Sequence, residues 1–569
     1  MFKRQVLIAA VVAAQIMADF APARGQTQQP QMAPLKPKIE RELPPGRGFI
    51  PPLRDLSHLD GASAQLTALP TALPTSFDWR TSGMITSVKN QSSCGSCYAF
   101  AGLGNLEALM LIDGAGTYDF SENYAKECNF YQSSCGGGTY EYVVNLFSQQ
   151  GAVLEACNPY VAADVACNSS CPKIKTILDW CIISDDAVPT ATDLKQYIYD
   201  HGPVYTTLYA GDGAAPSWET EYNNYDGSYT LYYTGTNTPN HAVLIVGWDD
   251  ALTHAGGTGG WIVKNSWGTG WGGTCGYGTE RGYFTIAYGS ASIGKFSSYS
   301  TAWQDYDATG ELLYYDEAGA SANWGFTNPT AWGLCGFTTT ITAYLNRVEF
   351  WTNDITTDVD VYVYDDFDGN SPSNLLGSKL NLSFTEAGYH SVVLDSPPLV
   401  PAGEDIFVVV KITNDSYGNP ICADGDGYTE NGLTYMSPTG TNGSWWEMGA
   451  GYGVDVAIRA RTSGTMDVYD SEPDQLPTQF RLGKNYPNPF NPSTIIEYSL
   501  TSRATVKLDV YNVLGQKIKT LVDATMPAGN HSVVWNGTDD SGNPVASGMY
   551  LYQIQAGVQT ETRKMLLLK

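Results

Sequence analysis

The chain has few basic residues: 31 lysines and arginines stand against 58 aspartates and glutamates, which gives a formal net charge of −27. A surface of that sign repels a phosphate backbone and offers no basic stripe to hold one. The composition therefore argues against a nucleic-acid partner. Because an acidic surface also serves exported proteins as a solubility device, the charge by itself indicates no substrate.

Long apolar runs are lacking after the N-terminus. Lys3 and Arg4 precede a mostly apolar stretch, residues 6–18, and small residues follow it. This pattern is typical of a signal peptide, to which we assign residues 1–25. No later segment approaches the roughly 20 apolar residues that a membrane-spanning helix needs. We therefore expect export and a mature chain without a transmembrane span.

Cysteine is absent from the last part of the chain. Of 11 cysteines, nine lie between Cys94 and Cys275, and the other two are Cys335 and Cys422. An exported chain meets an oxidising compartment, so disulfides are expected, and the odd count leaves at least one thiol unpaired. The uneven placement indicates separate modules, and a disulfide between Cys335 and Cys422 is the simplest pairing in the second of them.

The length of 569 residues exceeds what one hydrophobic core normally organises, so several domains are expected. Helical spacing predicts a helix over residues 96–112, and an apolar run predicts a strand over 242–248. Strand patterns dominate later, as where Val359, Val361 and Val363 alternate with other residues. The predicted order after the signal peptide is a proline-rich leader or short prosegment (26–74), a mixed domain (75–300), an all-β sandwich (301–465), a linker (466–479) and a small β-sandwich (480–569).

Cys97 is the first candidate for chemistry. It lies in the stretch NQSSCGSCYAF, residues 90–100, at the start of the predicted helix. Backbone N–H groups and the helix dipole favour a thiolate at such a position. A pair of cysteines two residues apart also occurs in redox and zinc sites, so Cys94 and Cys97 alone leave those alternatives open.

Two downstream motifs favour catalysis. His241 lies in the run NHAV, residues 240–243, and Asn265 lies in WIVKNSWGTGWG, residues 261–272. Together these motifs resemble the papain-like cysteine proteases over about residues 73–288. His241 follows Cys97 by 144 residues, within the roughly 130–150 expected for that family. The resemblance implies an α+β catalytic domain with two lobes, a helical lobe plus a β-barrel lobe, followed by two all-β sandwich domains.

The resemblance also implies roles. Cys97 is the nucleophile, and His241 accepts its proton to form a thiolate–imidazolium pair and later protonates the leaving amine. Asn265 orients the imidazole, and Gln91 donates to an oxyanion hole. Trp267 covers the bond between Asn265 and His241, with Trp271 as a second supporting aromatic. Read singly, His241, Trp267 and Trp271 could be core residues, and Asn265 and Gln91 could be turn residues.

Further positions follow from the resemblance alone. The glycine pair Gly137-Gly138 is expected to bind substrate backbone. The pocket for the second residue before the scissile bond is expected to hold a mostly apolar side chain, and its residues are Tyr140, Thr207, Pro239 and Ala242. The implied disulfides join Cys94 to Cys135 and Cys128 to either Cys167 or Cys171, which leaves Cys157, Cys181 and Cys275 unplaced.

The sequence departs from the family pattern in three ways. Tyr98 follows the nucleophile where a tryptophan is typical. Because both residues are large aromatics, we expect this substitution to be tolerated. Residues 210–238 form a longer, more aromatic segment than in compact members. The leader lacks the long helical inhibitory prosegment, so the resemblance leaves open whether residues 26–74 inhibit the enzyme.

The middle domain, through VYDDFDG at residues 363–369, resembles the lectin-like β-sandwich that follows papain-like domains in some microbial peptidases. That implies adhesion or substrate presentation, with glycans or cell-surface components as partners. Its loop carboxylates could hold calcium, but no complete calcium-loop motif is present, so solvated turns are favoured and no metal is assigned. These carboxylates are Asp366, Asp368, Asp424 and Asp426.

The last module resembles the immunoglobulin-like sorting domains of the type IX secretion route. The matching runs are NYPNPFNP (485–492), VYNVLGQ (510–516), SGMY (547–550) and RKMLLLK (563–569). That implies delivery by the type IX machinery across an outer membrane, to the medium or the cell surface. A plain immunoglobulin-like cap is the alternative.

The sequence thus predicts an exported cysteine endopeptidase that hydrolyses proteins or peptides through an acyl-enzyme and needs no cofactor. A surface adhesin with a vestigial protease domain is the alternative, against which the intact Cys97, His241, Asn265 and Gln91 argue. A cysteine amidase acting on cell-wall peptide is a third reading, but it is not expected to combine the Gln91 and Asn265 motifs.

Overall fold

The computed structural model describes residues 28–38, 43–61, 73–465 and most of 480–567. Within the last range, residues 484, 486–489, 491–493, 502–503, 527–528, 541 and 558 are not described. The predicted signal peptide and the linker 466–479 lie outside the described residues.

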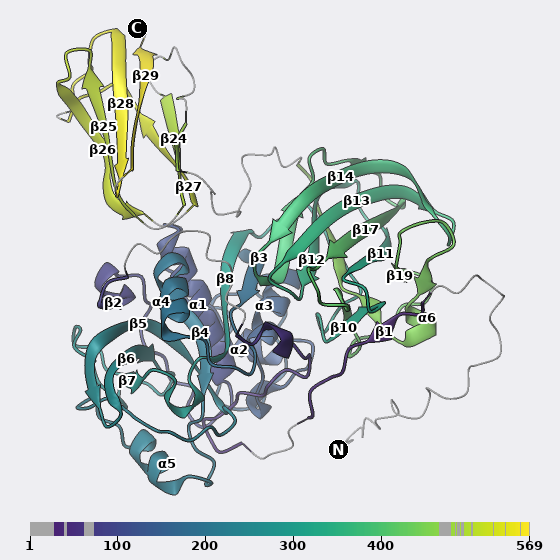
Figure 1. The fold of residues 1–569 in the computed structure, drawn as a ribbon, viewed down its shortest axis with the longest axis horizontal. Helices are drawn as coiled ribbons and strands as arrows, with labels where there is room; N and C mark the ends of the chain where they lie inside the picture. The colour runs from purple at the N-terminus through teal and green to yellow at the C-terminus, as the bar shows by residue number, and fades with distance from the viewer. Residues whose placement is uncertain are drawn as a thin grey trace.

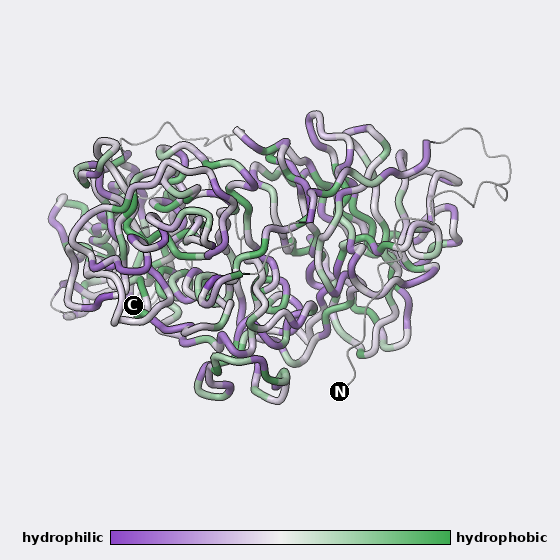
Figure 2. Tube along the Cα trace, turned by 90° about the horizontal axis from the view of Figure 1, so that it is seen from below, coloured by the Kyte–Doolittle hydropathy of each residue, from purple (hydrophilic) through white to green (hydrophobic). Residues whose placement is uncertain are grey.

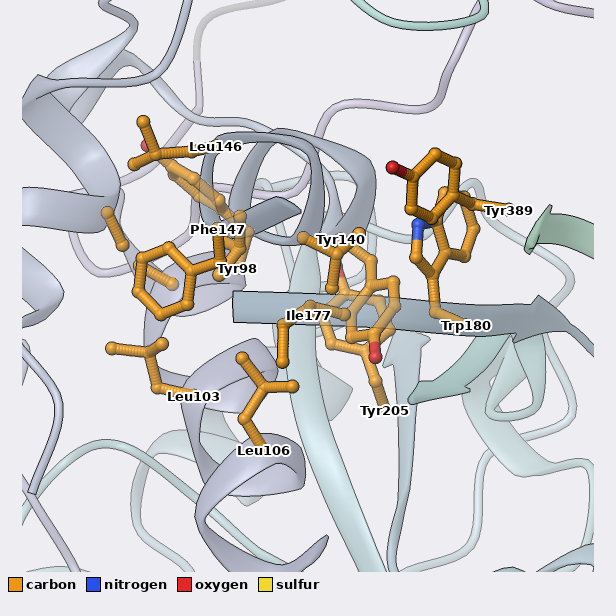
Figure 3. Close-up of a cluster of buried hydrophobic side chains, with 14 of the residues drawn as sticks. Tyr98, Leu103, Leu106, Tyr140, Leu146, Phe147, Ile177, Trp180, Tyr205 and Tyr389 are labelled. Atoms are coloured by element: carbon orange, nitrogen blue, oxygen red, sulfur yellow. The ribbon is translucent and has the colours of Figure 1, made fainter. Parts of the chain in front are cut away.

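One lobe of the first domain is helical and is built around a central helix. The predicted helix over 96–112 is confirmed as α1 (Cys97–Ile112), whose residues are buried on every side from Cys97 to Met110. A helix that is apolar all round belongs in an interior. Figure 3 shows Leu103 and Leu106 of α1 facing the core. The other helices of this lobe are α2 (Glu122–Glu127) and α3 (Tyr140–Gln149).

The second lobe is a β-sheet with two helices. Its strands follow the order β7-β6-β5-β4-β8-β3, and the predicted strand over 242–248 is confirmed within β5. Figure 2 shows hydrophobic stretches gathered in the interior of the molecule. The elements are β2 (Ser76–Asp78), β3 (Lys175–Ile182), α4 (Ala191–His201), β4 (Val204–Leu208), α5 (Pro216–Asn223), β5 (His241–His254), β6 (Gly257–Lys264), β7 (Tyr283–Ala287) and β8 (Lys295–Asp305).

The middle domain is a β-sandwich. Val359, Val361 and Val363 of β13 are buried while the residues between them are half-buried, which confirms the alternation expected of a strand with one face in a core. The elements are β9 (Leu312–Leu313), β10 (Ala322–Gly325), β11 (Thr330–Thr338), β12 (Ala343–Thr352), β13 (Thr357–Phe367), β14 (Pro372–Phe384), β15 (Ala387–Val393), β16 (Leu399–Val400), β17 (Asp405–Thr413), β18 (Ile421–Asp424), β19 (Thr434–Ser437), β20 (Trp446–Glu447), α6 (Gly449–Tyr452), β21 (Asp455–Val456) and β22 (Ile458–Ser463).

The first two domains share one continuous twelve-stranded sheet, because β15 of the middle domain pairs antiparallel with β3 of the protease-like domain. Tyr389 is paired with Trp180, and Figure 3 shows the two rings side by side. Gly388 is paired with Cys181, and a Cβ at Gly388 would lie 2.1 Å from the carbonyl oxygen of Trp180. The close approach of the two strands therefore requires glycine there.

A buried arginine reinforces this junction. Arg459 of β22 is fully buried and forms a two-point ion pair with Asp316, with Nε and Nη2 each 2.9 Å from a carboxylate oxygen. Its Nη1 donates to the hydroxyl of Ser148 of α3 at 2.9 Å, and its Nη2 also donates to Asn145 of the same helix. Since α3 belongs to the first domain, one charged group holds both domains together.

The predicted disulfide between Cys335 and Cys422 is wrong. Cys335 lies on β11 in the six-stranded sheet, and Cys422 lies on β18 in the four-stranded sheet. The Cys335 thiol donates to the carbonyl oxygen of Val456 at 3.3 Å, whereas the Cys422 thiol lies 3.6 Å from the Arg54 guanidinium. The two cysteines lie in different sheets and have separate partners, and they form no disulfide with each other.

The last domain is a second β-sandwich, of a three-stranded and a four-stranded sheet, drawn in yellow-green at the C-terminal end of the ribbon in Figure 1. Val506, Leu508 and Val510 of β25 are fully buried, as their alternation predicts. Its strands are β23 (Arg481–Leu482), β24 (Thr494–Leu500), β25 (Ala504–Asn512), β26 (Lys517–Met526), β27 (Gly529–Trp535), β28 (Gly548–Ala556) and β29 (Gln559–Leu567). The structure confirms the predicted fold class, which is an α+β domain followed by two all-β domains. None of the helices in the described ranges combines the length and apolar character needed to cross a bilayer.

We expect Gly388→Ala to lower the free energy of unfolding by about 1–3 kcal/mol, because the added methyl group collides with the Trp180 carbonyl. Urea denaturation followed by tryptophan fluorescence measures the change. Gly451→Ala in α6 is the matched control, because the nearest atom to its Cβ is 3.9 Å away and no loss is expected. Equal stability of the two variants would contradict the role assigned to Gly388.

Candidate active site

Cys97 and His241 each begin a secondary-structure element at the contact of the two lobes. Cys97 is the first residue of α1, His241 is the first residue of β5, and both side chains are fully buried. The backbone N–H of Ala242 donates to Cys97 Sγ at 3.3 Å. This bond joins the two chain segments at the sulfur of the candidate nucleophile.

Asn265 orients the imidazole of His241. It follows β6 directly, and its Oδ1 lies 2.8 Å from His241 Nε2. An amide oxygen accepts, so Nε2 carries the proton and Nδ1 is the basic nitrogen. Nδ1 has no hydrogen-bond partner among the described residues. The Trp267 ring lies 5.0 Å from the imidazole, and Trp271 packs on Trp267 at 5.1 Å, so both aromatics shield this pair.

Gln91 is buried in the loop before α1. Its Nε2 donates to the carbonyl oxygen of Cys94 at 2.7 Å and to that of Gly46 at 3.3 Å. Its Oε1 accepts from the Ser266 hydroxyl at 2.5 Å, which fixes the amide orientation. The Gln91 amide therefore points at a carbonyl group of the leader.

The disulfides hold the loops around the site. Cys94 is bonded to Cys135, which ties the loop before the nucleophile to the loop that carries Gly137 and Gly138. Cys128 is bonded to Cys167, which decides between its two expected partners. Cys157 and Cys171 form the third disulfide. The chain's other cysteines, all within the described residues, form no disulfide: Cys97, Cys181, Cys275, Cys335 and Cys422.

The leader runs through the cleft. Gly138 N–H donates to Gly48 O at 2.8 Å, and Ile50 N–H donates back to Gly138 O at 3.0 Å, so the leader and the glycine pair form a parallel β-bridge. Gly137 has a φ of 106°, and a Cβ there would lie 2.8 Å from Gly48 O. Both features require glycine, and the conformation presents the backbone for pairing.

Phe49 fills the pocket beside the glycine pair. Its side chain is fully buried, its ring centre lies 5.1 Å from that of Phe296, and its N–H donates to Asn240 O at 3.1 Å. Asn240 is itself fixed, since its side-chain oxygen accepts from Ala210 N–H at 2.8 Å. The pocket thus holds an apolar aromatic side chain.

Arg47 covers the other side of the site. Its guanidinium lies 4.9 Å from the Trp267 ring centre. Its Nη2 donates to Ala210 O at 2.9 Å and to Asn223 Oδ1 at 2.7 Å. Next to Arg47, Gly48 passes so closely that a Cβ on it would lie 1.8 Å from Gly95 O. The leader therefore closes the cleft on both sides of Cys97.

Burial in the closed site favours the neutral forms of Cys97 and His241. Burial raises the pKa of the Cys97 thiol to about 11, against the lowering effect of the N–H groups of Ala242, Gly48 and Tyr98. Burial lowers the pKa of His241 to about 3; the Asn265 bond opposes this, and the positive charge of Arg47 adds to it. Both shifts disfavour the thiolate–imidazolium pair, and burial is the largest cause of each. Of the leader residues, Arg47 lowers the pKa of both groups, and the Gly48 N–H lowers that of Cys97.

The predicted substrate-pocket residues divide into two groups. Tyr140 and Thr207 lie in the core, where the Tyr140 hydroxyl donates to Asn105 Oδ1 at 2.8 Å and the Thr207 hydroxyl donates to Lys295 O at 2.9 Å. Pro239 and Ala242 flank the Asn240–His241 segment at the site.

Sequence reasoning missed Phe296 and Asn240, which contact Phe49, and missed the leader residues in the cleft. Phe296 comes from β8, distant in sequence, and no local pattern distinguishes it from a core aromatic. The turn-forming glycine pair around Arg47, Gly46 and Gly48, was the one available signal in the leader.

Comparison with known proteins agrees with this geometry. Residues 73–301 match the family described as papain family cysteine protease, 312–462 match the lectin like domain, and 491–560 match the FlgD Ig-like domain. The chain is 33% identical over 223 residues to a cathepsin L-like proteinase of Fasciola hepatica, covering 38% of this chain and 61% of that protein. It is 29% identical over 222 residues to ananain of Ananas comosus, covering 38% and 56%.

The match thus spans less than two thirds of these relatives' own length. Among solved structures, the cysteine protease and lectin-like domains of Cwp84, a surface layer associated protein of Clostridium difficile, share the fold. That chain superposes with a TM-score of 0.59 at 19% identity, covering 74% of this chain and 93% of its own. The chain is thus similar to a papain-type cysteine protease domain over residues 73–301 and to a lectin-like domain over residues 312–462.

We expect Cys97 in the full chain to be alkylated slowly at pH 8. A thiol pKa of about 11 leaves on the order of one thiolate in a thousand at that pH, and the thiolate is the reacting form. Gly48→Ala should raise the alkylation rate at least ~tenfold, because its Cβ collides with Gly95 O and displaces the leader.

Peptide mapping after iodoacetamide treatment measures the rate at each cysteine. Cys275, a half-buried thiol in another part of the first domain, is the internal control and should react equally in both chains. Equal rates at Cys97 in the two chains would contradict the closure of the site by the leader.

Proposed function

We propose that this chain is an exported cysteine endopeptidase, made in a latent form in which residues 43–54 occupy its cleft. The observation that carries the proposal is the arrangement of Cys97 at a helix N-terminus, His241 beside it and Asn265 bonded to the imidazole at 2.8 Å. A nucleophile, a base and a group that orients the base are the parts needed for covalent acyl transfer.

The reaction begins when the leader has left. His241 Nδ1 takes the Cys97 proton, and the thiolate attacks the carbonyl carbon of the scissile peptide bond. The negative charge that develops on the carbonyl oxygen is stabilised by the Gln91 side-chain N–H and the Cys97 backbone N–H. The Gln91 donor now faces the leader's Gly46 carbonyl, at 3.3 Å.

The tetrahedral intermediate collapses when the imidazolium gives its proton to the leaving amine, which leaves an acyl-enzyme thioester on Cys97. His241 then deprotonates a water molecule, whose attack on the thioester carbonyl releases the acid and restores the thiol. Asn265 holds the imidazole in the same orientation through both steps. The reaction requires no cofactor.

The leader maintains latency by two physical effects. It excludes water from the site, which disfavours a charged thiolate and a charged imidazole. The Arg47 guanidinium adds a positive charge, which lowers the imidazole pKa further and disfavours the imidazolium, although it also lowers the thiol pKa, so exclusion of water is the larger effect. Separation of the leader from the catalytic domain would remove both effects and permit the ion pair.

Phe49 supports a substrate preference. It fills the pocket beside Gly138 and packs on Phe296, so a substrate with an apolar, preferably aromatic, side chain at the corresponding position would fit the same pocket. Pro239 and Ala242, from the pocket set implied by resemblance, border this region, whereas Tyr140 and Thr207 support it from the core.

The proposal predicts that Cys97→Ala abolishes hydrolysis. A fluorogenic peptide with Phe two residues before the scissile bond is the substrate, and the chain freed of its leader by limited proteolysis is the enzyme. Cys275→Ala, which changes a free thiol outside the site, is the matched control and should keep full activity. Retained hydrolysis by Cys97→Ala would refute the assignment, and inactivity of the unaltered enzyme on peptides and casein would favour the vestigial, adhesin-type reading.

We also propose that the last domain directs the chain to the type IX route and so to the outside of a bacterium with an outer membrane. The support is its position at the end of the chain, its immunoglobulin-like sandwich and the motifs named above, together with the predicted signal peptide. The lectin-like domain supports contact with glycans or other surface components.

The sorting proposal predicts that a chain ending at residue 479 stays in the periplasm. Fractionation of cells that carry the type IX machinery, with an immunoblot for the protease domain, measures its location. The full chain should reach the medium or the cell surface in the same cells. Equal surface delivery of the shortened chain would overturn the sorting role and leave the peptidase proposal intact.

A further inference from the structure

The middle domain holds the leader as an added strand. The leader strand β1 (Gln31–Met32) pairs antiparallel with β10, with Gln31 opposite Gly325 and Met32 opposite Trp324. Ala33 N–H continues the ladder to Asn323 O at 2.8 Å. Figure 1 shows β1, in purple, alongside β10. Without the leader, β10 is an edge strand with unpaired backbone groups.

A second arm of the leader lies on the same domain. The His58 ring stacks on the Tyr417 ring, with centres 3.7 Å apart and planes 4° apart, and His58 Nε2 lies 2.7 Å from Asn353 O. Asn323 donates to Asp55 O at 3.2 Å. The domain therefore offers a planar ring and polar groups next to the edge strand.

Between the two domains, Arg54 is buried at their boundary. Its guanidinium pairs with Glu141 of α3 at 3.0 Å on one side and lies 3.6 Å from Cys422 on the other. The two arms of the leader meet nearby, where Lys36 N–H donates to Leu53 O at 2.8 Å. The leader thus covers one continuous surface, which extends from the cleft to the middle domain.

This surface is within reach of a chain bound at Cys97. Arg54, at the middle domain, follows Gly48, beside Cys97, by only six positions. An extended chain of that length spans roughly 20 Å at most. A cavity of about 1780 Å³ runs beside the leader here, lined by Phe130 and Tyr142 of the first domain and by Ala320 and Ser321 of the middle domain. Any polypeptide longer than a few residues that leaves the Gly138 end of the cleft meets this surface.

We propose that, in the enzyme freed of its leader, the middle domain binds the distal arm of a polypeptide substrate on the surface that the leader now occupies. The arm adds a strand to the free edge of β10 and places a planar side chain on Tyr417. The partner is an extended or unfolded polypeptide, because edge pairing uses backbone groups and makes little demand on sequence. The inference rests on the proposed peptidase function and assigns the lectin-like domain a part in substrate selection.

The test compares a short and a long substrate on the full chain freed of its leader. The short substrate is a tripeptide reporter that cannot reach Tyr417, and the long substrate is a reduced, alkylated protein without fold. Tyr417→Ala should lower kcat/KM for the long substrate about fivefold to tenfold, mainly through KM, and leave the reporter unchanged. Tyr435→Ala, a half-buried tyrosine on β19 whose hydroxyl donates to Gly432 O, is the matched control and should change neither.

A second measurement uses the unaltered enzyme. A synthetic peptide of residues 51–60 contains the second arm but lacks Gly48 and Phe49, so it should inhibit hydrolysis of the long substrate and spare the reporter. Two results together would overturn the proposed surface. The peptide would inhibit hydrolysis of both substrates equally or of neither, and Tyr417→Ala would hydrolyse the long substrate normally. Absence of reporter hydrolysis would overturn the peptidase function, and this inference with it.

Discussion

The pairing of β3 with β15 is the contact on which the arrangement of the first two domains depends. It makes one sheet of strands from both domains, and it requires a glycine at Gly388 because the Trp180 carbonyl lies where a side chain would begin. Arg459 adds a buried ion pair that also reaches α3. Loss of one partner of such a pair typically costs about 3–5 kcal/mol, since the other charge stays buried without compensation. Strand pairing and this ion pair therefore fix the position of the middle domain relative to the cleft.

That fixed position explains how a leader whose described residues, 28–38 and 43–61, contain no long helix can close the cleft. The leader has few internal contacts, but two rigid surfaces hold it: the glycine pair at Gly138 and the edge of β10. Between them it carries Gly48 past Cys97 and Arg47 over Trp267. The same geometry that excludes water from Cys97 and His241 moves the pKa values of the two groups apart, so steric closure and electrostatic inactivity have one cause.

Local pattern predicted much of the molecule. Residues 96–112 have the composition of a central helix, the valines of β13 alternate as in a strand with one buried face, and the Cys94–Cys135 disulfide followed from the resemblance. The pairing expected for Cys335 and Cys422 failed, because counting cysteines says nothing of which sheet each strand joins. The contact of Phe296 was not predictable, because it joins segments more than two hundred residues apart. The path of the leader was not predictable either, because an extended chain has no periodic pattern.

The sequence by itself determined the candidate residues of the proposed chemistry. The motifs that resemble the papain-like proteases single out Cys97, His241, Asn265 and Gln91, because such short motifs are encoded by local order. Only the tertiary structure decided that these groups are neutral and covered, and that the middle domain shares their sheet. Strand pairing at Gly388, the stack of His58 on Tyr417 and the burial of Arg459 depend on long-range packing of surfaces, which no short stretch of sequence specifies.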